Sequence, residues 1–240
     1  MCRASFARWR GEGTPAPCGC VLLSVTPSVQ IGGVMSAEVY RLTGDVDEDA
    51  AAIDLAVSAL KRGELVVIPT ETVYGLVADD SVVGAVDRIY AAKQRDAGKP
   101  LQLLVSGVDV IDALGFVLSD VERRLAEKFW PGGLTLIVEH DGRIEGFRVP
   151  DSEIALEIVK RVGGALRSTS ANSSGDPAAL TAGEAEGYLG DSVSVVLDGG
   201  AVVGGVASSV VRVDGSGCVE VLREGAVAKA DLIAVGNMNG

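Results

Sequence analysis

Short apolar runs separated by helix-type periodicity constrain the fold of this chain more than any other feature. Residues 65–68 form one such run, closed by Pro69, and residues 101–105 form another. Runs this short with turn residues beside them are typical of buried strands. Before the first run, apolar side chains recur at helical spacing, at Ile53, Ala56, Val57 and Leu60. From Val39 onward the two patterns alternate, which predicts an α/β domain.

The same two patterns place the remaining elements. Further strands are expected at residues 134–139, 146–149, 165–167, 193–197, 208–213 and 219–222. Helices are expected from a cap at Asp47 to about Gly63, from a cap at Asp80 to Lys93, and over 108–114, 120–129, 152–162, 181–189 and 229–235. Several strands follow one another without a helix between them. The prediction is therefore a twisted mixed sheet with packed helices, rather than a doubly wound parallel sheet.

The first residues of the chain differ from the rest. Arg3, Arg8 and Arg10 stand against Glu12, and neither a helical nor an alternating pattern is present there. We predict a disordered extension over residues 1–34, or a translation start at Met35. Residues 35–240 are then expected to form one domain.

Composition excludes several classes of function. The net charge of -12 argues against a protein that coats nucleic acid through bulk positive charge. His140 is the single histidine, which excludes a three-histidine zinc centre. Cys2, Cys18 and Cys20 lie before the patterned region, so a disulfide framework within that region is excluded. A reducing, cytoplasmic location is therefore expected. No run of 18 apolar residues occurs, so no membrane association is expected.

Three polar segments carry the candidate chemistry. Residues 69–76 (PTETVYGL) follow a buried strand, at the edge where ligands of open α/β sheets bind. Residues 93–101 (KQRDAGKPL) bring three cations before a buried strand, which suits a phosphate site in an acidic chain. Residues 168–175 (STSANSSG) predict a loop whose N–H groups and hydroxyls can hold phosphate oxygens. Taken singly, these segments also fit a turn, a solvated helix end and a flexible surface loop.

The order of these segments is more specific than any one of them. With FWPGGLTLIV at 129–138, FRVP at 147–150 and LREG at 222–225, it closely resembles the YrdC/TsaC family of threonylcarbamoyl-AMP synthases, short single-domain type, over residues 38–228. The resemblance implies a YrdC-like fold with a large cationic cavity. It also implies a nucleotidyltransferase that makes L-threonylcarbamoyladenylate and pyrophosphate from L-threonine, bicarbonate and ATP, the first step of tRNA threonylcarbamoyladenosine modification. Mg²⁺ is expected with ATP, no organic cofactor is expected, and a downstream threonylcarbamoyl transferase is the implied partner.

The resemblance also assigns roles to particular residues. The family's KxR and SxN signatures fall on the implied catalytic residues Lys93, Arg95, Ser170 and Asn172. The L-threonine site is assigned to Thr72, Arg148, Ser168, Thr169 and Ser208. Arg148 is expected to act as a bidentate clamp on the amino-acid carboxylate. The ATP site is assigned to Arg95, Lys99, Ser170 and Arg223. No carboxylate cluster in the sequence identifies a metal ligand.

Two other functions fit the same sequence. The cavity could hold tRNA or double-stranded RNA, as a binding or ribosome-maturation module without ATP turnover. The acidic net charge and the 4% aromatic content argue against this alternative as the main role. A carbamoyl-adenylate former that uses another carbamoyl donor is the second alternative.

Overall fold

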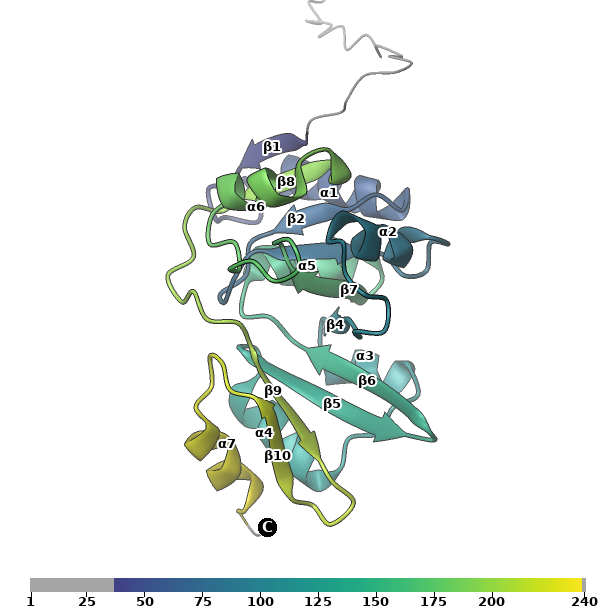
Figure 1. Cartoon of the computed structure of the whole chain (residues 1–240), viewed down its shortest axis with the longest axis vertical. Helices are drawn as coiled ribbons and strands as arrows, with labels where there is room; N and C mark the ends of the chain where they lie inside the picture. The colour runs from purple at the N-terminus through teal and green to yellow at the C-terminus, as the bar shows by residue number, and fades with distance from the viewer. Residues whose placement is uncertain (1–36, 239–240) are drawn as a thin grey trace, which may run out of the picture. The chain divides into compact units, whose positions relative to one another are not determined.

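The strands of this protein form one mixed sheet. The computed structural model describes residues 37–238, and ten strands within them pair in the order β1-β8-β2-β3-β7-β4-β6-β5-β9-β10 (Figure 1). The strands are β1 (Glu38–Arg41), β2 (Val66–Ile68), β3 (Gly75–Ala78), β4 (Gln102–Val105), β5 (Leu134–His140), β6 (Arg143–Arg148), β7 (Ala165–Ser170), β8 (Val195–Asp198), β9 (Ser209–Val213) and β10 (Val219–Arg223). The pairs β1–β8, β8–β2, β4–β6 and β5–β9 are parallel, and the remaining junctions are antiparallel.

Of the α-helices in residues 37–238, six lie between these strands in the sequence, a seventh follows the last strand, and all seven pack on the sheet. They are α1 (Ala50–Lys61), α2 (Ala85–Ala92), α3 (Val108–Ala113), α4 (Asp120–Phe129), α5 (Glu153–Val162), α6 (Ala182–Leu189) and α7 (Lys229–Gly236). Side-chain caps fix the start of three of them: Ser119 of α4, Ser152 of α5 and Thr181 of α6 each accept a bond from a backbone N–H of the first turn. At α4 the Glu122 carboxylate also accepts from Ser119 N, which completes a capping box.

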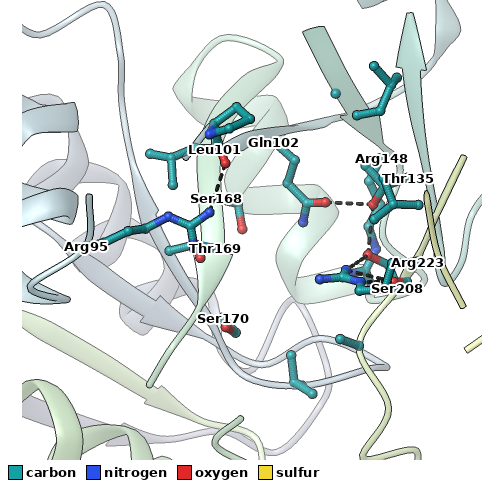
Figure 2. Close-up of a pocket in the computed structure, with 16 residues that line it drawn as sticks. Arg95, Leu101, Gln102, Thr135, Arg148, Ser168, Thr169, Ser170, Ser208 and Arg223 are labelled. Carbon is teal, nitrogen blue, oxygen red and sulfur yellow. Dashed lines mark hydrogen bonds between the residues drawn. The ribbon is translucent and has the colours of Figure 1, made fainter. Parts of the chain in front are cut away.

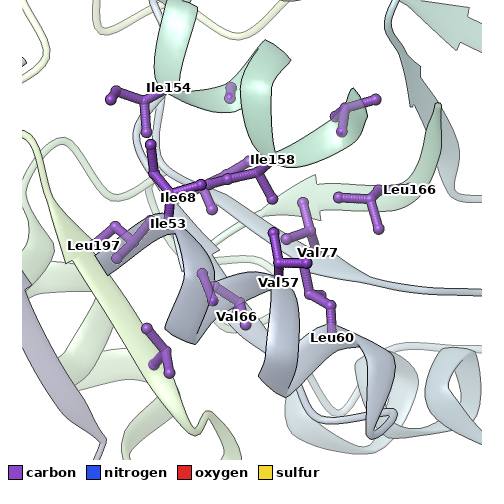
Figure 3. Packing of buried hydrophobic residues seen from close by; sticks show 14 of the residues in the cluster. Ile53, Val57, Leu60, Val66, Ile68, Val77, Ile154, Ile158, Leu166 and Leu197 are labelled. Carbon is purple, nitrogen blue, oxygen red and sulfur yellow. The ribbon is translucent and has the colours of Figure 1, made fainter. Parts of the chain in front are cut away.

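The two faces of the sheet are covered differently. Helices α1 and α5 pack on one face of the β1-to-β4 half, against Val66, Val77, Leu104 and Leu166 (Figure 3). Helices α2 and α6 cover the opposite face of that half. In the other half, α3, α4 and α7 pack on the face of the sheet that carries Leu103, which is opposite to the α1/α5 face. Side chains alternate along a strand, so the α1/α5 face continues across β6, β5 and β9 without a covering helix.

The predicted mixed sheet with packed helices is confirmed, and the predicted helix over 120–129 agrees with α4. The two predicted aspartate caps are wrong. The α1 helix begins at Ala50, and Asp47 lies before it. The α2 helix begins at Ala85, after Gly84, which has a left-handed conformation with a φ of 81°. The Asp80 carboxylate forms an ion pair with Arg167 instead, at 2.9 Å.

Two strands also differ from the prediction, since β3 was missed and β7 is longer than expected. Strand β3 was not predicted, because it overlaps the polar segment 69–76 and begins with Gly75, a residue type that is depleted in strands. The predicted loop over 168–175 begins later, since Ser168–Ser170 complete strand β7. The prediction of a disordered extension over 1–34 and a start at Met35 concerns residues outside the described range. None of the helices in residues 37–238 combines the length and the apolar character that crossing a bilayer requires.

Candidate active site

The uncovered face of the sheet forms the floor of a cavity. On this face Arg148 of β6 lies beside Thr135 of β5, which pairs with Val210 of β9, and Val210 pairs with Arg223 of β10. On β4, Leu104 pairs with Arg148, and Gln102, two residues earlier on the same face, pairs with Ser168 of β7. The register of six neighbouring strands therefore brings residues that are far apart in the sequence to one surface (Figure 2).

The cavity has a volume of about 240 Å³ and collects most of the predicted site residues. The predicted residues that line it are Arg95, Arg148, Ser168, Thr169, Ser170, Ser208 and Arg223. Thr72, Lys93, Lys99 and Asn172 are not among its lining residues. None of the described residues that line it is acidic, so its charge comes from three guanidinium groups. Such a surface suits an anionic ligand.

Arg148 is buried and already bonded to the protein on one side. Its Nη2 donates to Glu71 Oε1 at 2.6 Å and to Thr72 Oγ1 at 2.7 Å, and its Nε donates to Gly132 O at 3.1 Å. Within residues 37–238, Nη1 has no acceptor, and the side chain lines the cavity. The expected bidentate clamp is thus not available while these contacts hold, because Nη1 alone remains for a ligand. Thr72 acts here by fixing the guanidinium.

Lys93 and Asn172 form a buried support beneath the end of β7. Lys93 is 2% exposed, and its ammonium donates to Ser170 O at 2.5 Å, to Asn172 O, and to Asn172 Oδ1 at 3.3 Å. Asn172 Nδ2 donates to Asp176 O at 2.6 Å and to Ser173 O at 3.0 Å. Three acceptors use all three N–H groups of the ammonium. In this structure Lys93 therefore holds the turn after Ser170.

The loop between α2 and β4 brings Arg95 to the cavity wall. Its Nη2 donates to Pro100 O at 3.1 Å and its Nε lies 3.5 Å from Lys99 O. These contacts use the backbone of the loop to hold the guanidinium at the cavity, while the Lys99 side chain is exposed outside the lining. Arg95 and Arg223 lie on opposite sides of the cavity (Figure 2).

Arg223 is held by Ser208, the residue before β9. Its Nε and Nη2 donate to Ser208 O at 3.1 and 2.7 Å, and Nη2 lies 3.3 Å from Ser208 Oγ. Burial lowers the pKa of the Arg223 guanidinium, and the positive charges of Arg148 and Arg95 lower it further. The three cations therefore repel one another, and a bound anion would relieve that repulsion.

Gln102 and Thr135 are cavity residues that the sequence reasoning missed. Thr135 Oγ1 donates to Gln102 Oε1 at 2.7 Å and lies 2.8 Å from Ser208 Oγ. Each is a polar residue inside an otherwise apolar strand segment, at the second position of LQLLV and of LTLIV. A polar side chain in such a run is a signal that one face of the strand is not covered.

The segment after β10 has one glycine that the cavity wall requires. A Cβ on Gly225 would lie 2.2 Å from Ala207 O and 2.7 Å from Ser208 O. We expect Gly225→Ala to lower the free energy of unfolding by about 1–3 kcal/mol and to displace Arg223, because backbone atoms cannot yield as a side chain can. Thermal denaturation measures this. Gly187→Ala, in α6 with open space around its Cβ, is the matched control and should not lower stability. An equal loss in both variants would contradict the prediction.

Comparisons with known proteins show the family of this chain. The family model for Sua5/YciO/YrdC, described as telomere recombination, matches residues 58–225. A Mycobacterium leprae relative, provisionally named a threonylcarbamoyl-AMP synthase, is 38% identical over 201 residues, which is 80% of this chain and 90% of its own length. The threonylcarbamoyl-AMP synthase of Chromohalobacter salexigens is 36% identical over 173 residues, 68% of this chain and 91% of that protein.

A solved structure shares the fold as well. The crystal structure of Pyrococcus abyssi Sua5 complexed with L-threonine superposes with a TM-score of 0.74 at 29% identity. The match covers 82% of this chain, which spans 59% of the length of that protein. The family model matches more than half of the chain, and two relatives above 30% identity are covered over most of their length. The chain therefore belongs to the Sua5/YciO/YrdC family.

Proposed function

We propose that this protein is an L-threonylcarbamoyl-AMP synthase, which converts L-threonine, bicarbonate and ATP into L-threonylcarbamoyladenylate and pyrophosphate. The observation that carries the proposal is the cavity of this family member, which combines Arg95, Arg148 and Arg223 with the hydroxyls of Ser168 and Ser170. Relatives above 30% identity bear the name of this enzyme, and the Sua5 structure was solved with L-threonine. The reaction is the first step of tRNA threonylcarbamoyladenosine synthesis.

The reaction joins three reactants in two bond-forming steps. The threonine amine attacks the carbon of CO₂ derived from bicarbonate and loses a proton, which gives an N-carboxylate. An oxygen of this carboxylate attacks the α-phosphorus of ATP, the bond to the β-phosphate oxygen breaks, and pyrophosphate leaves with the bonding electrons. Fixed cations that face the α-phosphate lower the energy of this transition state, so the protein acts by positioning and electrostatics.

The proposed sites divide the cavity between the two larger reactants. Threonine lies on the Arg148 side, where Ser168, Thr169 and Ser208 complete the lining and Thr72 orients the guanidinium. ATP lies between Arg95, Ser170 and Arg223, with Lys99 reaching the phosphates from outside the lining. Lys93 and Asn172 support Ser170 from below. This division keeps the assignments implied by the resemblance and changes the roles of Thr72, Lys93 and Asn172 to positioning.

Magnesium is proposed to enter with ATP rather than to reside in the protein. Residues 37–238 contain no group of three or more His, Cys, Asp or Glu side chains that could hold a metal ion. Phosphate and water oxygens would then fill most of the Mg²⁺ coordination shell. The adenylate is consumed by a threonylcarbamoyl transferase acting on tRNA, and we propose that both reactions occur in the cytoplasm.

Pyrophosphate release tests the proposed function. The purified protein is incubated with ATP, Mg²⁺ and bicarbonate, with and without L-threonine, and with L-serine as a control for amino-acid selectivity. We expect release that depends on L-threonine. Folded protein that shows no such release would contradict the proposal and would favour the RNA-binding alternative, which predicts salt-sensitive RNA affinity without ATP turnover.

The buried support under Ser170 predicts a pH dependence. Burial, and to a lesser extent the positive charge of Arg95, lower the pKa of Lys93 to about 8. Above that pH the neutral amine has two N–H groups for three acceptors, so the turn after Ser170 loosens. We expect the rate of pyrophosphate release to fall as the pH rises through about 8. In Lys93→Arg, whose guanidinium does not titrate in this range, the rate should be lower but free of that fall. An identical pH profile in both proteins would exclude Lys93 as its cause.

A further inference from the structure

We propose that Gln102 contacts the substrate, and that its side-chain amide donates hydrogen bonds to an oxygen of the L-threonine carboxylate. This inference rests on the proposed function and adds a residue to its threonine site. Gln102 is half-buried at the start of β4 and lines the cavity. Figure 2 shows its side chain directed into the cavity from the strand between Ser168 and Arg148.

The register of β4 places Gln102 next to the residues assigned to threonine. Gln102 pairs directly with Ser168 across the antiparallel β4–β7 junction. Leu104, two residues further on the same face, pairs with Arg148 across the β4–β6 junction. Paired side chains on one face lie about 5 Å apart and diagonal neighbours about 7 Å apart. One small ligand can therefore touch the side chains of Gln102, Ser168 and Arg148.

A chain of hydrogen bonds sets the orientation of the Gln102 amide. Arg223 can only donate, so at Ser208 Oγ it fills an acceptor position and leaves the serine proton for Thr135 Oγ1. Thr135 then donates its own proton to Gln102 Oε1, at 2.7 Å. The amide oxygen is thereby occupied by the Thr135 hydroxyl. Gln102 Nε2, which has no acceptor within residues 37–238, presents its two N–H groups to the cavity.

The contacts of Arg148 create a need for this second donor. Its Nε and Nη2 are bonded to Gly132, Glu71 and Thr72, so only Nη1 remains for a bound carboxylate. A carboxylate has two oxygen atoms that each accept more than one hydrogen bond. Nη1 can serve one oxygen, and the amide of Gln102 is the neighbouring group that can serve the other without adding charge. Thr135 acts as the positioning residue for that amide.

Two variants at position 102 test the contact. Gln102→Met keeps the length of the side chain and removes both donors. We expect the KM for L-threonine to rise about 10- to 100-fold, with a much smaller change in the KM for ATP, because a hydrogen bond to a charged group is lost. Gln102→Glu should raise the KM for L-threonine further, since it places a carboxylate beside the carboxylate of the ligand. Thr135→Val should raise the threonine KM more than Thr135→Ser, which keeps the hydroxyl.

A spectroscopic measurement on the unchanged protein decides whether the contact is direct. The chain has three glutamines, Gln30, Gln94 and Gln102, so the Gln102 side-chain amide can be assigned in an NMR spectrum. We expect its ¹H and ¹⁵N signals to shift when L-threonine is added and those of Gln94 to stay. An unshifted Gln102 amide, or an unchanged threonine KM in folded Gln102→Met, would overturn the inference. Loss of threonine-dependent release in the wild-type protein would instead contradict the proposed function.

Discussion

Replacement of Arg148 by methionine is expected to abolish threonine-dependent pyrophosphate release and to weaken the fold. The guanidinium lines the cavity through Nη1 and is the cation nearest to the proposed threonine carboxylate. Its removal also leaves the Glu71 carboxylate without its 2.6 Å partner, although Glu71 Oε2 is already buried without a hydrogen bond. Breaking a buried pair on one side costs about 3–5 kcal/mol, and the partial exposure of Glu71 puts this site at the lower end.

A double variant separates the two effects of Arg148. In Arg148→Met with Glu71→Gln, no unpaired charge remains, so most of the lost stability should return in thermal denaturation. Threonine binding should not return, because the cation that recognises the carboxylate is still absent. Isothermal titration with L-threonine measures this directly. Recovery of binding in the double variant would show that Arg148 serves only to neutralise Glu71.

The fold was predictable from the sequence because its signals are local. Ser152 and the apolar residues at helical spacing after it predict helix α5. The apolar run after Gly133 predicts strand β5. Strand β3 gave a weaker signal, since it begins with Gly75 and overlaps the polar segment 69–76. The ten-strand order was not predictable, because it depends on pairings such as β3 with β7 that join residues about ninety positions apart.

The candidate site was predictable in part for a related reason. Motif order pointed to Arg95, Arg148 and Arg223. No sequence spacing shows that β6 and β10 present Arg148 and Arg223 on one face of the sheet, or that the loop before β4 brings Arg95 to the same cavity. Lys93 was expected at the phosphates because it belongs to the cationic segment 93–101 and to the KxR signature. Its burial became understandable only when the fold brought three acceptor oxygens from Ser170 and Asn172 around its ammonium.

The last prediction concerns Arg95, which we expect to be needed for catalysis and dispensable for folding. Its guanidinium lines the cavity opposite Arg223 and bonds to the protein only through carbonyl oxygens of its own loop, within residues 37–238. Arg95→Ala removes no core packing, so the melting temperature should change little. Loss of one cation that stabilises the charged transition state should lower the rate of adenylate formation about 100- to 1,000-fold.

A matched arginine outside the cavity controls for a general effect of charge. Arg212 of β9 is exposed, pairs with Glu220 at 2.6 Å and does not line the cavity. Arg212→Ala removes the same charge and should leave pyrophosphate release within about twofold of wild type, because an exposed ion pair contributes little. If Arg95→Ala and Arg212→Ala reduced the rate equally, net charge would explain the loss. A rate that falls only in Arg95→Ala, with ATP affinity reduced as well, would place this guanidinium on the phosphates.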